Sequence, residues 1–297
     1  MNWRAVGTQM PRPRRLFGAL IAVAGVLVLT QNAWEAAVFH DPRVAQALLG
    51  GLMAAAATAL GTVPMLVSRP LSERVQDTLL GFGAGVMLAA SSFSLIIPGL
   101  EAAIDQGAGP WMSGAIIGGG ILIGAALLLG IDYALPHEHF IKGIEGSRAK
   151  SIKRAWLFVF AICLHNLPEG LAIGVAFGGS DPAAATALTT GIAIQDVPEG
   201  LVVALALRGV GFSRMLAIGL GVASGMIEPV GAVLGASVVT VSATLLPWGL
   251  AFAAGAMLFV VSHEIIPESH RKGHERFATG GLMVGFVLMM MLDTSLG

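Results

Sequence analysis

Eight long apolar segments, separated by short polar connections, follow one another from about residue 44 to the end of the chain. They cover 44–68, 78–98, 111–135, 154–178, 184–208, 214–238, 246–268 and 277–296. Each reaches the roughly 20 residues that an α-helix needs to cross the hydrocarbon core of a bilayer. The connections are too short for a separate soluble domain. The pattern therefore predicts an all-α, polytopic membrane helix bundle that forms a single domain over residues 44–297.

Residues 1–43 have a pattern of their own. Four arginines and two prolines occupy residues 1–15, and an apolar run follows from about 16 to 30. A basic start before a short apolar core is typical of a signal peptide. An extra membrane helix is the favoured interpretation, because apolar and small residues continue as far as Phe39. We therefore expect a basic cytoplasmic N-terminus and one transmembrane helix in addition to the eight that follow.

Composition and charge agree with a membrane protein and fix its predicted orientation. Hydrophobic residues make up 55% of the chain and charged residues 12%, whereas soluble domains carry about 25% charged residues. If the N-terminus is cytoplasmic and nine helices cross, all of the 17 Lys and Arg residues except Arg43 fall on the cytoplasmic side. Basic residues favour that side, and the C-terminus then lies outside. The short connections favour a bacterial inner membrane. The sequence contains no P-loop pattern, which argues against an ATP-driven pump.

Two consecutive spans carry nearly the same polar motif within their apolar sequence. The motifs read His165-Asn166-Leu167-Pro168-Glu169-Gly170 and Gln195-Asp196-Val197-Pro198-Glu199-Gly200. At about 100° per residue, positions i, i+1 and i+4 share one face of a helix. Each proline lacks an N–H, which frees the carbonyl four residues earlier, here that of Leu164 or Ile194. Broken helices at this depth are a device of transporters.

A fourth acidic residue lies at the same depth on the next span. With Glu228 in 214–238, the predicted midplane carries four carboxyl groups, from Glu169, Asp196, Glu199 and Glu228. Ionisable residues in a membrane are costly and mark functional sites. No Lys or Arg lies near the centre of any span, so either protons or cations must neutralise these groups. Two divalent ions would balance four carboxylates.

These paired Pro-Glu-Gly motifs resemble those of the ZIP (Zrt/Irt-like) family of divalent-metal transporters, most closely its bacterial branch. The resemblance extends over about 44–297 and implies an eight-helix core, inward transport and a homodimer. It implies a metal site formed by His165, Asn166, Glu169, Gln195, Asp196, Glu199 and Glu228. Many family members carry His-Glu-x-Pro-His-Glu on the fifth helix. Here Gln195 and Glu199 replace the histidines and Asp196 replaces the first Glu, which argues against strict zinc selectivity.

Three further residues are weaker candidates. Met87 lies near the centre of 78–98, where its thioether is a candidate soft ligand, although methionine in a core is usually a packing residue. His263 and Glu264 lie near the predicted cytoplasmic end of 246–268. They are candidates for an exit path that accepts metal from the central site, and the alternative is an ordinary solvated helix end.

Transport of divalent transition metals is the leading functional hypothesis. A mixed nitrogen and oxygen site without thiolate suits Zn²⁺ and also Cd²⁺, Fe²⁺ or Mn²⁺, whereas Mg²⁺ and Ca²⁺ prefer oxygen ligands alone. One alternative is an intramembrane metal-dependent protease, but Pro267 stands where the His-Glu-x-x-His signature needs its second histidine. The other is a proton-coupled carrier without bound metal. We expect no enzyme activity, and as partners metal ions, the lipid bilayer and a second copy, but no nucleic acid.

Overall fold

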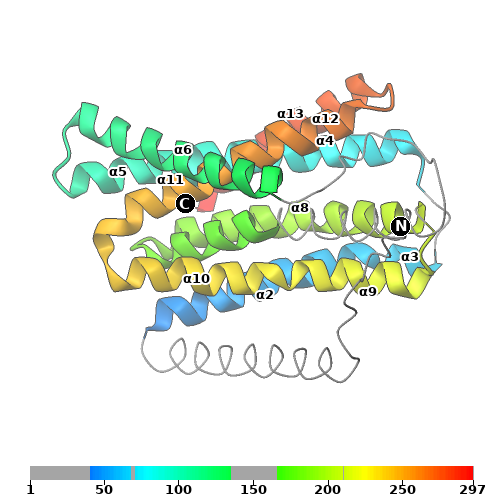
Figure 1. The fold of residues 1–297 in the computed structure, drawn as a ribbon, viewed down its shortest axis with the longest axis horizontal. Coiled ribbons are helices and arrows are strands. Elements are labelled where there is room, and N and C mark those ends of the chain that lie inside the picture. The colour runs from blue at the N-terminus through cyan, green and yellow to red at the C-terminus, as the bar shows by residue number, and fades with distance from the viewer. Residues whose placement is uncertain (1–40, 68–70, 135–165, 210, 297) are drawn as a thin grey trace, which may run out of the picture. The chain divides into compact units, whose positions relative to one another are not determined.

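In the computed structural model, which describes residues 41–67, 71–134, 166–209 and 211–296, every regular element of this part of the chain is helical (Figure 1). The longer helices are α2 (Pro42–Thr62), α4 (Glu73–Ala89), α6 (Pro110–Ala134), residues 166–178, α8 (Pro182–Gly209), α9 (Arg214–Gly225), α10 (Ile227–Val241), α11 (Leu246–Val260) and α13 (Glu275–Leu296). Shorter pieces are α3 (Pro64–Val67), the π-helix η1 (Ala90–Ile96), α5 (Ile97–Asp105), the 3₁₀-helix η2 (Ala243–Leu245), the π-helix η3 (Val261–Ile265) and α12 (Ile266–His270).

The predicted all-α membrane architecture is confirmed. Among the described residues, seven helical stretches are long and apolar enough to cross a membrane. They are Pro42–Leu66, Glu73–Asp105, Pro110–Ile131, Pro182–Gly209, Arg214–Val241, Ala243–His270 and Glu275–Leu296. Each corresponds to one predicted span. Of the remaining span, 154–178, only residues 166–178 are described, and the predicted N-terminal helix lies outside the described residues.

Local sequence explains where the helices begin. Proline suits the first turn of a helix, because its missing N–H would have no partner there. It opens four helices, at Pro42, Pro64, Pro110 and Pro182. Serine caps two others, since the hydroxyl of Ser72 accepts from the Val75 N–H and that of Ser213 from the Leu216 N–H.

Glycines let several pairs of helices approach closely. On α4 and α13 the facing positions are Gly81, Gly85, Gly281 and Gly285. A Cβ at any of these four positions would collide with a backbone carbonyl oxygen of the other helix. Small residues at this four-residue spacing allow close backbone contact between membrane helices. Helices α6 and α11 make the same kind of close backbone contact at Gly124 and Gly255.

Two long spans contain the same local departure from α-helical geometry. In each, a π-helical segment ends at the first residue of an Ile-Ile-Pro sequence. η1 ends at Ile96, two residues before Pro98, and η3 ends at Ile265, two residues before Pro267. The N–H groups of Ile97 and Ile266 bond to the carbonyls five residues earlier. A proline lacks an N–H for the carbonyl four residues before it, which favours the wider turn. Such π turns frequently occur at functional sites, and η1 packs against α8 and α11.

The broken span is not the one that carries Pro198. Helix α8 continues as α-helix through Pro198, because membrane helices tolerate proline where neighbouring groups and local adjustment compensate for the lost bond. The interruption lies instead in the span Arg214–Val241. There α9 ends at Gly225, Met226 forms a turn, and α10 begins at Ile227. Glu228 therefore lies in the first turn of a helix, where a negative charge is favoured.

Candidate metal centre

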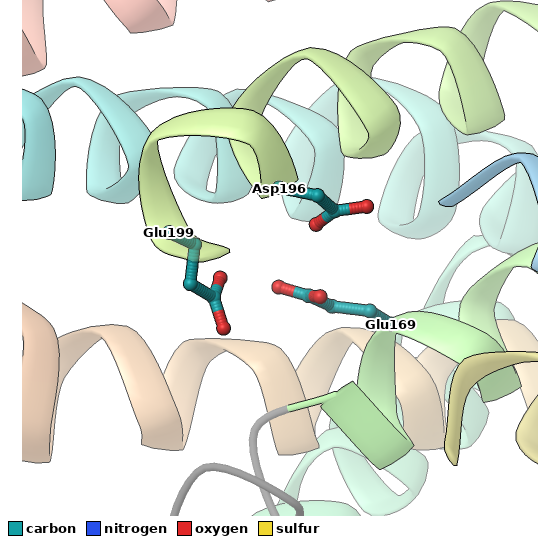
Figure 2. A group of neighbouring side chains, drawn as sticks. All are labelled: Glu169, Asp196 and Glu199. Carbon is teal, nitrogen blue, oxygen red and sulfur yellow. The ribbon is translucent and has the colours of Figure 1, made fainter. Parts of the chain in front are cut away.

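Two neighbouring helices bring three acidic side chains together, and Figure 2 shows their carboxylates pointing toward one another. Glu169 comes from residues 166–178, and Asp196 and Glu199 come from adjacent turns of α8. One carboxylate oxygen of each lies within 4.8 Å of those of the other two. Two oxygens bound to one tetrahedral Zn²⁺ at about 2.0–2.2 Å lie about 3.3–3.6 Å apart. Side-chain movements of about 1 Å would therefore place all three in one coordination shell.

Glu228 stands beside this trio with hydrogen-bond donors of its own. Its side chain is fully buried, with 0% exposure. Its Oε1 accepts from Asn166 Nδ2 at 3.1 Å and from Thr58 Oγ1 at 3.0 Å. Asn166 belongs to the same helix as Glu169, and Thr58 belongs to α2. Three helices therefore contribute the acidic and amide groups of the cluster, and α2 adds the Thr58 hydroxyl.

Gln195 ties the two helices of the trio together. Its Nε2 donates to Glu169 Oε1 at 2.6 Å and to Asp196 Oδ1 at 2.7 Å. An amide that donates to two carboxylates stabilises their negative charge and fixes which oxygen of each faces elsewhere. Gln195 is only 1% exposed. In this arrangement it orients two carboxylates through its nitrogen.

Each of four buried side chains keeps one oxygen that accepts no hydrogen bond from the described residues. These oxygens are Asn166 Oδ1, Glu169 Oε2, Asp196 Oδ2 and Glu228 Oε2. Leaving a buried polar atom without a partner costs about 1–3 kcal/mol, and more when it is charged. A bound ion or an ordered water supplies the partner of such atoms in folded proteins. The amide donors thus occupy one oxygen of each carboxylate and leave the other for a cation.

The electrostatics of the cluster favour the same kind of ligand. Carboxylates that share a buried site repel one another, and removing each from water carries a further cost. The only basic residue on α8 is Arg208, at its far end. Protons or cations must supply the missing positive charge, and one divalent cation neutralises two carboxylates.

The glycine that follows each glutamate brings the helices into contact. A Cβ on Gly170 would collide with the carbonyl oxygen of Glu228, and one on Gly200 with that of Thr58. The first contact sets Glu169 beside α10, and the second sets Glu199 beside α2. Each Pro-Glu-Gly motif thus combines a proline that lacks an N–H, an acidic side chain and a close helix contact.

The structure brings together six of the predicted central residues: Asn166, Glu169, Gln195, Asp196, Glu199 and Glu228. His165 lies outside the described residues. Met87 is fully buried on α4. A Cβ on Gly83, one helical turn earlier, would lie 3.3 Å from Gln195 Oε1, so Met87 is on the α4 face that turns toward α8.

His263 and Glu264 lie apart from this centre, in the π turn η3. His263 is exposed, and its ring stacks on Phe259 with the centroids 4.9 Å apart. Glu264 is half-buried. Thr58 is the participant that the sequence analysis missed. A threonine within an apolar span was the available signal, but a hydroxyl there usually bonds its own backbone, and only the packing of α2 on α10 brings it to Glu228.

The fold and the cluster define a multi-pass helical membrane protein with an acidic site inside the bundle. Residues 136–293 match the family model described as ZIP Zinc transporter. The chain belongs to the ZIP zinc transporter family, which confirms the resemblance found in the sequence.

Curated relatives from bacteria and from animals support this assignment. The chain is 51% identical over 297 residues to zinc transporter ZIPB of Bordetella bronchiseptica, covering 96% of this chain and 93% of the relative. It is 48% identical over 250 residues to zinc transporter GufA of Myxococcus xanthus, covering 84% and 98%. Human zinc transporter ZIP11 is 33% identical over 335 residues, covering 86% and 98%.

Proposed function

We propose that this protein transports divalent transition-metal ions across the membrane, with Zn²⁺ as a substrate. One observation carries the proposal: carboxylate oxygens of Glu169, Asp196 and Glu199 lie within 4.8 Å of one another, among four buried oxygen atoms on three helices that accept no hydrogen bond from the described residues. The relatives named above are zinc transporters, which supports the choice of metal. Family membership also identifies a transporter and not an enzyme.

The proposed ligands are the side chains of the cluster. Asp and Glu oxygens and imidazole nitrogen bind Zn²⁺, so the ligand set comprises Glu169, Asp196, Glu199 and Glu228, with the amides Asn166 and Gln195. His165, next to Asn166 in the sequence, and Met87 on α4 complete the proposed set. Four carboxylates balance two divalent ions, so we propose a two-metal site in which shared carboxylates bridge the ions.

The remaining features of the proposal come from the sequence and the family resemblance. Mixed nitrogen and oxygen ligation without thiolate extends the proposed substrates to Cd²⁺, Fe²⁺ and Mn²⁺. The distribution of Lys and Arg supports a cytoplasmic N-terminus and an outside C-terminus. The family resemblance implies inward transport, and the short connections favour a bacterial inner membrane. His263 and Glu264, near the proposed cytoplasmic end, would receive ions that leave the centre. The proposed oligomer is a homodimer.

Uptake into proteoliposomes tests this function. The purified wild type should carry Zn²⁺ or Cd²⁺ into vesicles that contain a metal-sensitive dye, and Glu199→Ala should abolish the signal because it removes a ligand from the trio. Glu275→Ala is the matched control, since Glu275 is exposed in the first turn of α13. Undiminished uptake by Glu199→Ala would contradict the proposed site. A wild type that carries protons but binds no metal would favour the proton-coupled alternative.

A further inference from the structure

We infer that Thr58 is a positioning residue that sets the selectivity of the proposed metal centre: its hydroxyl occupies Glu228 Oε1, so that Glu228 offers only Oε2 to the transported ion. This inference rests on the proposed transport function and deepens it. It concerns a residue of α2 that is not itself a proposed ligand. The argument comes from the hydrogen bonds of Thr58, its packing and the coordination chemistry of carboxylates.

The hydroxyl of Thr58 has one proton and two acceptors within reach. Glu228 Oε1 is 3.0 Å away, and the carbonyl oxygen of Ala54, one turn earlier on α2, is 3.3 Å away. A charged acceptor at the shorter distance forms the stronger bond. Thr58 is only 2% exposed, so water does not compete freely. The hydroxyl therefore donates to Glu228 whenever that side chain is ionised.

Packing holds Thr58 in this place from two sides. A Cβ on Gly225, at the end of α9, would lie 2.9 Å from Thr58 Cβ and 3.3 Å from its Oγ1. Gly200, directly after Glu199, faces the Thr58 backbone carbonyl. Thr58 thus lies at the junction of α2, α8 and the break between α9 and α10. Thr58 therefore contacts both the helix that carries Glu199 and, through its hydroxyl, Glu228 itself.

The hydrogen bond limits how Glu228 binds a metal. Asn166 Nδ2 also donates to Oε1, but Asn166 is a proposed ligand, whereas Thr58 acts only on the carboxylate. Together the two donors take both lone pairs of Oε1, so Glu228 coordinates through Oε2 alone, and removing the Thr58 hydroxyl frees one lone pair of Oε1 for the ion. One oxygen per carboxylate suits the four-coordinate, tetrahedral shell of Zn²⁺. Two oxygens per carboxylate raise the coordination number, which larger cations accept. Loss of the Thr58 hydroxyl should therefore favour Cd²⁺ relative to Zn²⁺.

Initial rates of Zn²⁺ and Cd²⁺ uptake by the full-length protein in proteoliposomes test this. Thr58→Val keeps the shape and removes the hydroxyl, whereas Thr58→Ser keeps the hydroxyl. Thr62→Val is the matched control, because Thr62 is one turn along α2, is 1% exposed and donates to the Ala59 carbonyl. Losing a hydrogen bond to a charged group shifts an equilibrium about tenfold. Thr58→Val should raise the kcat/KM ratio of Cd²⁺ to Zn²⁺ about three- to tenfold, mainly through a lower KM for Cd²⁺.

The controls separate positioning from a general structural role. Thr58→Ser and Thr62→Val should keep the wild-type ratio. An unchanged ratio in Thr58→Val, or the same change in Thr62→Val, would overturn the inference. If Thr58→Val does not fold, Thr58→Ala compared with Thr58→Ser decides the question in the same way. A wild type that transports neither ion would refute the proposed function itself, whereas a transporting wild type with an unchanged Thr58→Val ratio refutes only the role of Thr58.

Discussion

Replacing Gly170 by alanine should separate the two helices that carry Glu169 and Glu228. The added methyl group would lie 2.8 Å from the Glu228 Cα and closer still to the Glu228 carbonyl oxygen. Optimal contacts between carbon atoms are about 3.5–4.0 Å, so the backbones must move apart by about 1 Å. Both obstructing atoms belong to the backbone, and therefore no side-chain rotation can relieve the collision.

Two losses follow from a movement of that size. Overpacking at a close contact typically costs about 1–3 kcal/mol of stability. Metal ligands must lie within about 0.2 Å of their ideal distances, so a movement of about 1 Å between Glu169 and Glu228 should cut Zn²⁺ uptake at least tenfold. The measurements are the melting temperature in detergent and Zn²⁺ uptake into proteoliposomes, normalised to the amount of folded protein.

Gly219→Ala is the matched control for this change. Gly219 lies inside α9, and a Cβ built there has no atom within 4 Å. Alanine is the better helix former by about 1 kcal/mol, so this variant should be at least as stable as the wild type and transport normally. Wild-type uptake by Gly170→Ala would refute the view that the glycine after Glu169 sets the geometry of the site. Equal losses in both variants would point to a general effect of glycine replacement.

Three further outcomes are expected. Gln195→Leu removes the donor shared by Glu169 and Asp196, so the affinity for Zn²⁺ should fall about tenfold or more, as measured by calorimetry; unchanged affinity would show that Gln195 does not orient them. Zn²⁺ uptake should decrease as the pH is lowered, because carboxylates must lose protons to bind metal, and an increase would instead support proton-driven carriage. Asp77→Ala should lower thermal stability by about 1–3 kcal/mol, because it breaks the 2.7 Å bond between the buried Asp77 and His274 that joins α4 to the start of α13; an unchanged melting temperature would contradict this.

Hydrophobic length was sufficient to predict the helices, because a membrane span must satisfy all its backbone groups within itself. The described spans agree with the predicted ones to within a few residues except Glu73–Asp105, which starts earlier and ends later than 78–98. The later end arises because α5 continues the helix through Pro98, its second residue, to Asp105, and the earlier start is set by the cap at Ser72. The hydrophobic periodicity of a segment and the predicted membrane depth of its residues do not reveal a π turn.

The central cluster was predictable for a different reason. The i, i+1 and i+4 spacing places Gln195, Asp196 and Glu199 on one face of any helix, so no tertiary information was needed. Thr58 required the packing of α2, and the break at Met226 required the contacts of α9 and α10. Pro198 suggested a break in the wrong span, because proline removes one hydrogen bond, but α8 continues as α-helix through it.

Anomalous diffraction at the zinc absorption edge, from crystals grown with Zn²⁺, would locate the ion in the bundle. A peak should lie between Glu169 and Glu199, at about 2.0–2.2 Å from oxygen atoms of both side chains. Glu228 should coordinate the ion through Oε2, with Oε1 still bonded to Thr58. No peak at the cluster in a Zn²⁺-transporting protein, or a peak elsewhere in the bundle, would contradict the claim that these buried carboxylates hold the transported ion.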